Sequence, residues 1–203
     1  MDVRDANQII WQKLGDVITV QRGASPRPIS KFITKGGGVA WVKIGDVSLN
    51  SKYVKQTAQK ITQEGAERSR YLKKGDFIIS NSMSFGRPYI MGIDGCIHDG
   101  WASLSEYEEN FASDFLYYYL SSDKVQKYWD SKVNVGGVGN LNSDIIKSLD
   151  LPIVSEKVQN HVVQILDKFD TLTSDITKGL PKEIELRQKQ YEYYRDKLLT
   201  FEK

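Results

Sequence analysis

Apolar residues recur at helical spacing through the C-terminal quarter of the chain, between residues 156 and 201. In the first part of this segment they alternate at intervals of four and three residues, the 3.5-residue period of a helix that packs against another helix. The row consists of Val158, Val162, Ile165, Phe169, Leu172, Ile176 and Leu180, and it continues through Ile184, Tyr191, Tyr194, Leu198 and Phe201. The pattern predicts a helical, coiled-coil-like arm whose uncovered apolar stripe meets a partner.

The start and a possible break of this arm are marked by proline, serine and glycine. Pro152 marks the edge of the preceding domain, and Ser155 can cap the helix that follows. Gly-Leu-Pro at 179–181 offers that helix a stop and a second helix a start. We therefore expect a body over residues 1–152 and a helical region over 153–203. The break leaves open a single rod, a bent pair, or a hairpin folded back on the body.

The body begins with short stretches rich in β-branched and aromatic residues, which are typical of strands. These predicted strands cover residues 17–20, 39–44, 77–80 and 89–93. Helices are predicted afterwards, over residues 113–121 and 123–131, with a short one starting at 141. Strands followed by helices indicate an α+β fold, here a mixed α/β domain with a β-rich core.

The predicted elements of the body are joined by long polar loops that are rich in glycine. They cover residues 22–38, 80–88, 98–101 and 134–140. Loops of this length on a rigid scaffold are more often functional than not. Their basic ends and small hydrogen-bond donors suit a surface that meets phosphates and base edges.

The net charge of +2 hides a strong asymmetry along the chain. Residues 1–90 hold 15 Lys and Arg against 7 Asp and Glu, a net of +8, whereas residues 91–150 have a net of −6. Such a charge distribution suits binding to a polyanion, but a basic face exposed to solvent explains it equally well. The single cysteine, Cys96, and the lack of a long apolar run favour a cytoplasmic protein without a membrane span.

No residue pattern in the chain predicts an active site. The glycine runs at 36–38 and 136–139 do not match a phosphate-loop or dinucleotide fingerprint. Two histidines and one cysteine, far apart, disfavour a zinc site, so we expect neither a metal nor a bound cofactor. His98, Asp99 and Ser103 lie too close in sequence for a catalytic triad, and His98 is better explained as a satisfied loop histidine.

Several short motifs, taken in order, cover nearly the whole chain. They are WQKLGDV at 11–17 with RG at 22–23, KGDFIIS at 74–80, FLYYYL at 115–120, GGVGNLN at 136–142, LPI at 151–153, VQILDKF at 163–169 and EIELRQKQYEYYRDKLL at 183–199. Together they resemble the specificity subunit of type I restriction-modification systems, in a half-length form.

The resemblance implies a non-catalytic target recognition domain that binds double-stranded DNA, followed by a helical spacer. It also implies binding to methyltransferase subunits, which bring S-adenosylmethionine, and through them to the restriction subunit. Full-length family members carry two recognition domains and two spacers, whereas these 203 residues hold one of each. A single domain reads half of a split DNA sequence.

Two hypotheses follow from the resemblance. In the first, two copies pair through the C-terminal helices and read a palindromic split site. In the alternative, the chain is a non-catalytic interaction module, either an inactive remnant or a recognition domain that exchanges with another specificity subunit. The expected DNA contacts are Arg22, Arg27, Lys31, Lys35 and Arg87 for phosphates or guanine, and Asn81, Ser82 and Asn140 for base reading. The expected interface residues are Val158, Val162, Ile165, Phe169, Leu172, Ile176, Ile184, Tyr191 and Leu198.

Overall fold

The computed structural model describes residues 9–48, 51–81, 85–135, 140–175 and 181–201. Its strands are β1 (Ile10–Lys13), β2 (Thr19–Arg22), β3 (Ile33–Thr34), β4 (Val39–Val42), β5 (Tyr53–Val54), β6 (Gln59–Ile61), β7 (Arg70–Leu72), β8 (Phe77–Ser80), β9 (Pro88–Met91), β10 (Gly95–Ile97), β11 (Trp101–Ser105) and β12 (Asp150–Ile153). Its helices are α1 (Leu14–Val17), α2 (Gln63–Glu67), α3 (Ser113–Leu120), α4 (Asp123–Val135), α5 (Ser143–Lys147), α6 (Glu156–Asp175) and α7 (Pro181–Leu198), with 3-10 turns η2 (Ile29–Lys31) and η3 (Ile44–Asp46). The expected mixed α+β fold is confirmed.

The central sheet has the strand order β2-β11-β8-β9-β5, antiparallel except for the parallel pair β5–β9. Alternate residues of a strand face opposite sides of a sheet. Accordingly, Phe77 and Ile79 join the larger core beneath α3 and α4, while Ile78 joins a second core with Trp101. The sheet is therefore covered on both faces, which explains why β8 and β9 are buried at every position.

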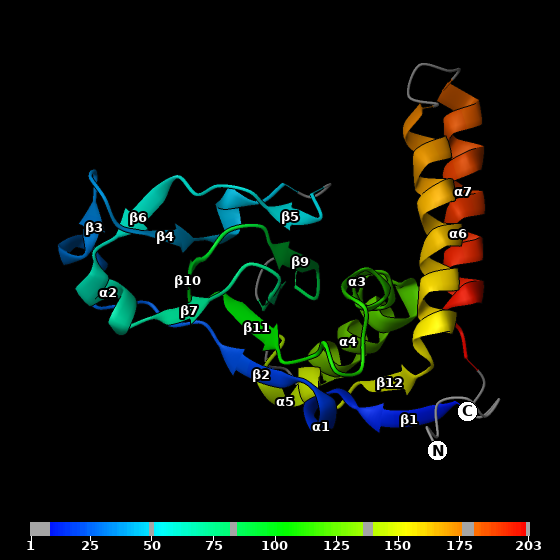
Figure 1. Cartoon of the computed structure of the whole chain (residues 1–203), viewed down its shortest axis with the longest axis horizontal. Helices are drawn as coiled ribbons and strands as arrows, with labels where there is room; N and C mark the ends of the chain where they lie inside the picture. The colour runs from blue at the N-terminus through cyan, green and yellow to red at the C-terminus, as the bar shows by residue number, and fades with distance from the viewer. Residues whose placement is uncertain (1–8, 49–50, 82–84, 136–139, 176–180, 202–203) are drawn as a thin grey trace.

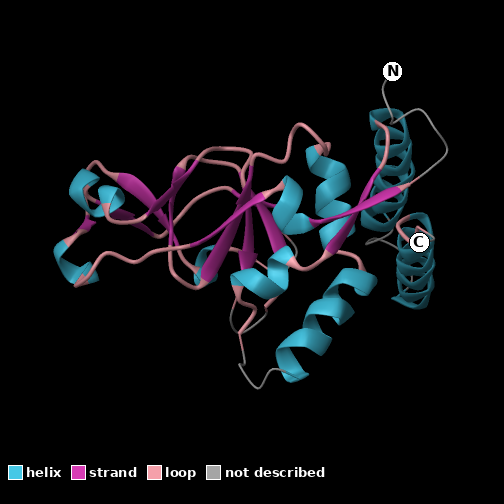
Figure 2. Ribbon diagram, turned by 90° about the horizontal axis from the view of Figure 1, so that it is seen from below, coloured by secondary structure: helices cyan, strands magenta, loops and turns pink. Residues whose placement is uncertain are grey.

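A second sheet, with the order β3-β6-β4-β10-β7, forms a lobe at the far end of the body (Figure 1). Its small core contains Phe32, Trp41, Ile61 and Cys96. Cys96 is fully buried there, as expected for a small apolar side chain. Figure 2 shows the same arrangement from below, with both sheets extending away from a helix pair at the opposite end.

The helix pair consists of α6 and α7, which lie side by side and run in opposite directions (Figure 1). Ser155 is placed as the predicted cap, because its Oγ lies 3.4 Å from the Val158 amide nitrogen. The Phe169 and Tyr194 rings stack between the two helices with centroids 5.4 Å apart. Within the described residues the arm is thus a hairpin and not a single rod.

The expectation that the apolar row is uncovered is wrong for part of that row. Val162 is buried in the main core of the body, and Tyr191 and Leu198 pack against that core. The hydroxyl of Tyr118 on α3 donates a hydrogen bond of 2.6 Å to the Asp167 carboxylate on α6. Part of the stripe therefore meets the chain's own body. Ile176 and Leu180, and the side chains of Leu172 and Ile184, lie outside the described residues.

The first and last strands of the body pair with each other at the foot of this helix pair. β1 runs antiparallel to β12, with Ile10 opposite Ile153 and Lys13 opposite Asp150. Among the described residues, no helix combines the length and apolar character needed to cross a membrane.

Candidate nucleic-acid interface

Three segments that are distant in sequence meet at one edge of the central sheet. β11 is antiparallel to both β2 and β8, so the ends of β2 and β8 lie beside the start of β11. Arg22 ends β2, and Asn81 follows β8 directly. The Leu141 amide donates a hydrogen bond of 3.0 Å to the Asn81 carbonyl oxygen, which attaches the segment before α5.

A pocket of about 240 Å³ opens at this edge. Its lining residues are Arg22, Asn81, Ala102, Asn140, Leu141, Asn142 and Ser143. Three of the eight expected DNA contacts, Arg22, Asn81 and Asn140, are thus brought together. Asn142 has a structural role, since its Oδ1 accepts a hydrogen bond from the Ile145 amide and caps α5. The pocket walls present one guanidinium and three amide side chains.

The loop at 98–100 accepts hydrogen bonds from two of these side chains. Asn81 Nδ2 donates to the Asp99 carbonyl oxygen at 3.1 Å, and the Asn81 amide donates to the Gly100 carbonyl oxygen at 3.0 Å. Arg22 Nε donates to the same Asp99 carbonyl oxygen at 3.4 Å. Both side chains are therefore oriented by one peptide group.

The Asp99 carboxylate faces the loop that follows β2. Ser25 Oγ donates to Asp99 Oδ1 at 2.9 Å, and Arg27 Nη2 lies 3.8 Å from Oδ2. The Arg27 side chain is 85% exposed, so water screens this ion pair and leaves the guanidinium accessible.

His98 has a hydrogen-bond partner at each ring nitrogen. Nδ1 accepts from the Gly100 amide at 2.9 Å, and Nε2 lies 2.9 Å from Asp99 Oδ1. Nδ1 is an acceptor, so Nε2 carries the proton that the carboxylate accepts. Ser103 is buried in the sheet and its hydroxyl donates to the Gln21 carbonyl oxygen. His98 is thus a satisfied loop histidine, as expected.

Gly23 allows the β2 end to approach this loop closely. A Cβ atom at Gly23 would lie 2.1 Å from the His98 carbonyl oxygen, which is main chain and cannot swing away. The Gly23 amide donates to the Trp101 carbonyl oxygen at 2.8 Å. The absence of a side chain at this position lets Arg22 reach the pocket.

The remaining expected DNA contacts either lie apart from the pocket or fall outside the residues that the structure describes. Lys31 ends η2 and Lys35 follows β3, so both are exposed on the lobe of the second sheet. Arg87 is half-buried and hydrogen-bonds to Tyr89, whose pKa is raised by burial although Arg87 acts to lower it. Ser82 lies outside the described residues.

The outer surface of the helix pair carries apolar side chains that the heptad pattern did not select. On α7, Leu186 is 59% exposed and Tyr193 is 60% exposed. They are seven residues apart and therefore share one face of the helix. Of the predicted row on α6, Val158 is 41% exposed, whereas Ile165 and Phe169 are half-buried. The seven-residue spacing of a leucine and a tyrosine could have identified this face.

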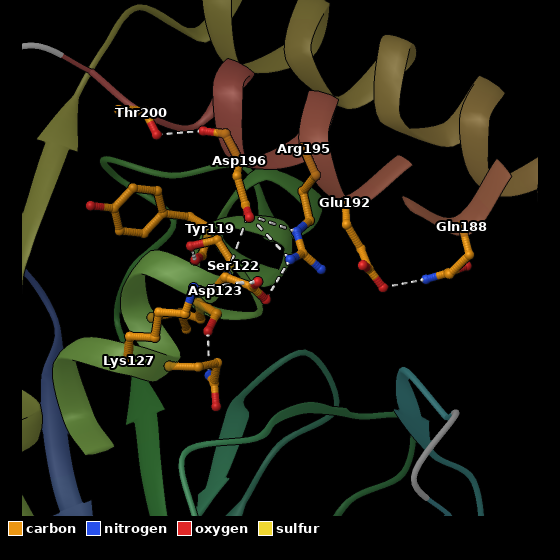
Figure 3. Close-up of polar contacts among 11 residues, drawn as sticks. Tyr119, Ser122, Asp123, Lys127, Gln188, Glu192, Arg195, Asp196 and Thr200 are labelled. Atoms are coloured by element: carbon orange, nitrogen blue, oxygen red, sulfur yellow. Dashed lines mark hydrogen bonds and ion pairs between the residues drawn. The ribbon is translucent and has the colours of Figure 1, made fainter. Parts of the chain in front are cut away.

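An ion pair joins the helix pair to the body on its other side. Figure 3 shows Arg195 of α7 between Asp196 and Asp123, the first residue of α4. Arg195 Nη2 lies 2.9 Å from Asp123 Oδ1 and 3.1 Å from Asp196 Oδ1, and the arginine side chain is only 12% exposed. The hairpin is thus fixed to both α3 and α4.

Comparison with known proteins identifies the family of this fold. Residues 10–186 match the type I restriction modification DNA specificity domain. The chain is 31% identical over 205 residues to the specificity subunit of type I restriction enzyme EcoR124I/EcoR124II from Escherichia coli, with 97% of this chain and 49% of that protein covered. The EcoprrI specificity subunit from the same species is 26% identical over 207 residues, which cover 97% of this chain and 51% of that protein.

A solved structure shares the fold at lower sequence identity. The HsdS subunit from Thermoanaerobacter tengcongensis superimposes with a TM-score of 0.68 at 18% identity, over 96% of this chain and 45% of that chain. The chain spans about half the length of the relatives it matches. By its match over residues 10–186, the chain belongs to the type I restriction-modification DNA specificity family.

Proposed function

We propose that this chain reads one half of a split DNA target for a type I restriction-modification complex. The observation that carries the proposal is the meeting of Arg22, Asn81 and Asn140 around one pocket at the edge of the central sheet. Family membership supports DNA sequence recognition as the task of the domain.

The chemistry of the pocket suits the reading of base edges. An arginine guanidinium pairs with the two acceptors of guanine in the major groove, and an asparagine amide pairs with the donor and acceptor of adenine. Arg22 and Asn81 offer one group of each kind, held by main-chain atoms. Arg27, Lys31 and Lys35 are exposed and would contact phosphates, which position the protein without selecting a sequence.

We further propose that residues 153–203 set the spacing between recognition domains and hold the methyltransferase subunits. Those subunits would carry S-adenosylmethionine and link the chain to the restriction subunit, while the chain itself has no catalytic role. Leu186 and Tyr193, which share one face of α7, would supply the main contact surface, and Val158 on α6 would add to it, because exposed large apolar side chains favour a protein partner.

The second recognition domain in this proposal comes from another copy of the chain. Two copies related by a two-fold axis present identical reading surfaces, so the target is a palindrome interrupted by a gap. The rigid attachment of the hairpin to α3 and α4 would fix the length of that gap.

Selection from a randomised duplex library tests the proposal. The chain is tagged in its host, purified with the subunits that accompany it, and used to recover bound DNA for sequencing. We expect enrichment of one symmetric split sequence, and weaker binding when its gap is changed by one base pair. Recovery of an asymmetric split sequence, dependent on a different specificity subunit, would favour the exchange hypothesis. No enrichment of any sequence would contradict DNA reading.

A further inference from the structure

We propose that Asp99 is a positioning residue, which orients the base-reading side chains without itself contacting DNA. This inference rests on the proposed DNA-reading function. It assigns a task to an acidic residue that lies beside Arg22 and Arg27. Its basis is the set of contacts that Asp99 makes with the segment after β2, with Asn81 and with its neighbour His98.

The main chain of Asp99 supports the pocket. Its carbonyl oxygen accepts hydrogen bonds from Asn81 Nδ2 at 3.1 Å and from Arg22 Nε at 3.4 Å. The bond to Arg22 uses Nε, whereas the two terminal nitrogens of the guanidinium form the end that can pair with guanine. A shift of this one carbonyl group would therefore move both side chains together.

The side chain of Asp99 fixes the position of that carbonyl group. Oδ1 accepts from Ser25 Oγ at 2.9 Å and lies 2.9 Å from His98 Nε2. Ser25 Oγ also lies 3.3 Å from the Asp99 amide nitrogen, so the serine and the aspartate are joined twice. The carboxylate thus ties the 98–100 loop to the segment that continues from Arg22.

Main-chain hydrogen bonds hold the two ends of the loop, on either side of Asp99. The Trp101 amide donates to the His98 carbonyl oxygen at 3.0 Å, and the Ala24 amide donates to the Ile97 carbonyl oxygen at 3.2 Å. Gly23 packs against the His98 carbonyl group. Because both ends of the loop are held, the Asp99 carbonyl group is the part of the loop that a change at the Asp99 carboxylate can move.

The negative charge of Asp99 distinguishes two possible roles of this residue, positioning of the pocket side chains and neutralisation of Arg27. A negative charge near bound DNA repels phosphates and lowers affinity for every sequence. If Asp99 only neutralised Arg27, its removal would raise affinity equally for all duplexes. If Asp99 positions Arg22 and Asn81, its removal would raise non-specific affinity but reduce discrimination.

The experiment compares Asp99→Ala, which removes both the charge and the Oδ1 acceptor, with the wild type in the purified complex. The probes are the duplex recovered from the library and a scrambled duplex of equal length, and binding is measured at several salt concentrations. We expect tighter binding to the scrambled duplex and a loss of roughly ten-fold in the ratio of the two affinities, the scale set by one misplaced bidentate base contact. Asp130→Ala is the matched control, since it makes the same charge change at an exposed site on α4 and should preserve the ratio.

Ser25→Ala gives a second test that leaves the net charge unchanged. It removes the hydroxyl bound to Asp99 Oδ1, so the affinity ratio should fall while binding to the scrambled duplex stays the same. It also tests the inference if Asp99→Ala does not fold. Ser131→Ala, on the exposed face of α4, is its control.

Two results would overturn the inference, and they are distinguishable from each other. An unchanged affinity ratio in folded Asp99→Ala, or in Ser25→Ala if the first variant is unfolded, would show that Asp99 does not position the pocket. A wild-type complex that binds both duplexes equally would remove the proposed function itself, and the inference with it.

Discussion

At the scale of single residues, the candidate site depends on main-chain atoms as much as on side chains. The Asp99 carbonyl oxygen accepts from Arg22 and Asn81, and the Asn81 carbonyl oxygen accepts from the Leu141 amide. Main-chain partners have fewer alternative positions than long side chains, so they hold a reading group at lower entropic cost. Substitutions that displace the backbone should therefore damage this site more than their size suggests.

Gly23→Ala tests how tightly the backbone is packed at this site. The new methyl group would lie within 2.1 Å of the His98 carbonyl oxygen, so the loop must shift. We expect the free energy of unfolding to fall by about 1–3 kcal/mol, the usual cost of overpacking, together with weaker DNA binding. Gly45→Ala is the control, because a Cβ there meets no atom within 4 Å. Equal urea midpoints for the two variants would contradict the close packing.

Tyr191 should make the helix pair sensitive to alkaline pH. Burial raises its pKa to about 12, from 10.0 for a free tyrosine. Between these values the unfolded chain releases a proton that the folded chain keeps, so stability falls as pH rises. Tyr191→Phe should flatten the decline by up to about 1.4 kcal/mol per pH unit, measured by urea unfolding between pH 9 and 11.5. An unchanged slope in Tyr191→Phe would contradict the burial of this hydroxyl group in the folded chain.

At the scale of elements, the residue types along the sequence predicted the buried strand β8 but did not predict the interior strand β11. Phe77–Ser80 was predicted and is observed as β8. Trp101–Ser105 was missed because its sequence, WASLS, has no β-branched residues, and its place depends on pairing with β2 and β8 on either side. The expected strand at 17–20 begins only at Thr19, since Leu14–Val17 forms a helical turn with Leu14 buried in the core.

The candidate site was predictable only in part, for a related reason. Arg22, Asn81 and Asn140 could be selected by chemistry and loop position, because each residue type is suited to base contacts. The role of Asp99 depends on three segments that only the folded sheet brings together. Likewise, the heptad row suggested an external partner for Val162, whereas tertiary packing covers it within the chain.

The outward face of α7 should be required for assembly and not for folding. Leu186→Glu with Tyr193→Glu places charge where both side chains are more than half exposed. We expect loss of self-association or of methyltransferase binding in light scattering, with an unchanged circular dichroism spectrum. Gln188→Glu is the control, since it adds one charge on another side of the same helix. Intact complexes in the double variant would remove this face from the interface.

At the scale of the whole molecule, the pocket edge of the central sheet and the helix pair are parts of one connected body. Lys52 in the segment before β5 lies 2.7 Å from Asp114 on α3, and its ammonium group lies 4.8 Å from the centre of the Tyr117 ring. α3 in turn contacts α6 through Tyr118 and Asp167. A change in the direction of the hairpin would therefore move the sheet and its pocket with it.

Arg22 and Arg27 should contribute to DNA binding by the whole complex in different ways. Arg22→Gln should cost roughly 1–3 kcal/mol with the selected target and relax preference at one base pair. Arg27→Gln should weaken binding to all duplexes and reduce the slope of log affinity against log salt by about 1. Binding curves at several salt concentrations measure both effects. Identical behaviour of the two variants would contradict the division between base and phosphate contacts.

The pairing of β1 with β12 has a consequence for how such chains can be joined. The strand that opens the described chain and Phe201 near its end lie together, since the Trp11 and Phe201 rings are 6.2 Å apart in an edge-to-face contact. A second unit fused in tandem would need only a short connection, and neither unit would have to be distorted. If the body reads one half-site as proposed, gene duplication, or replacement of one body by another between the same two strands, would yield new combinations of half-sites beside an unchanged helix pair.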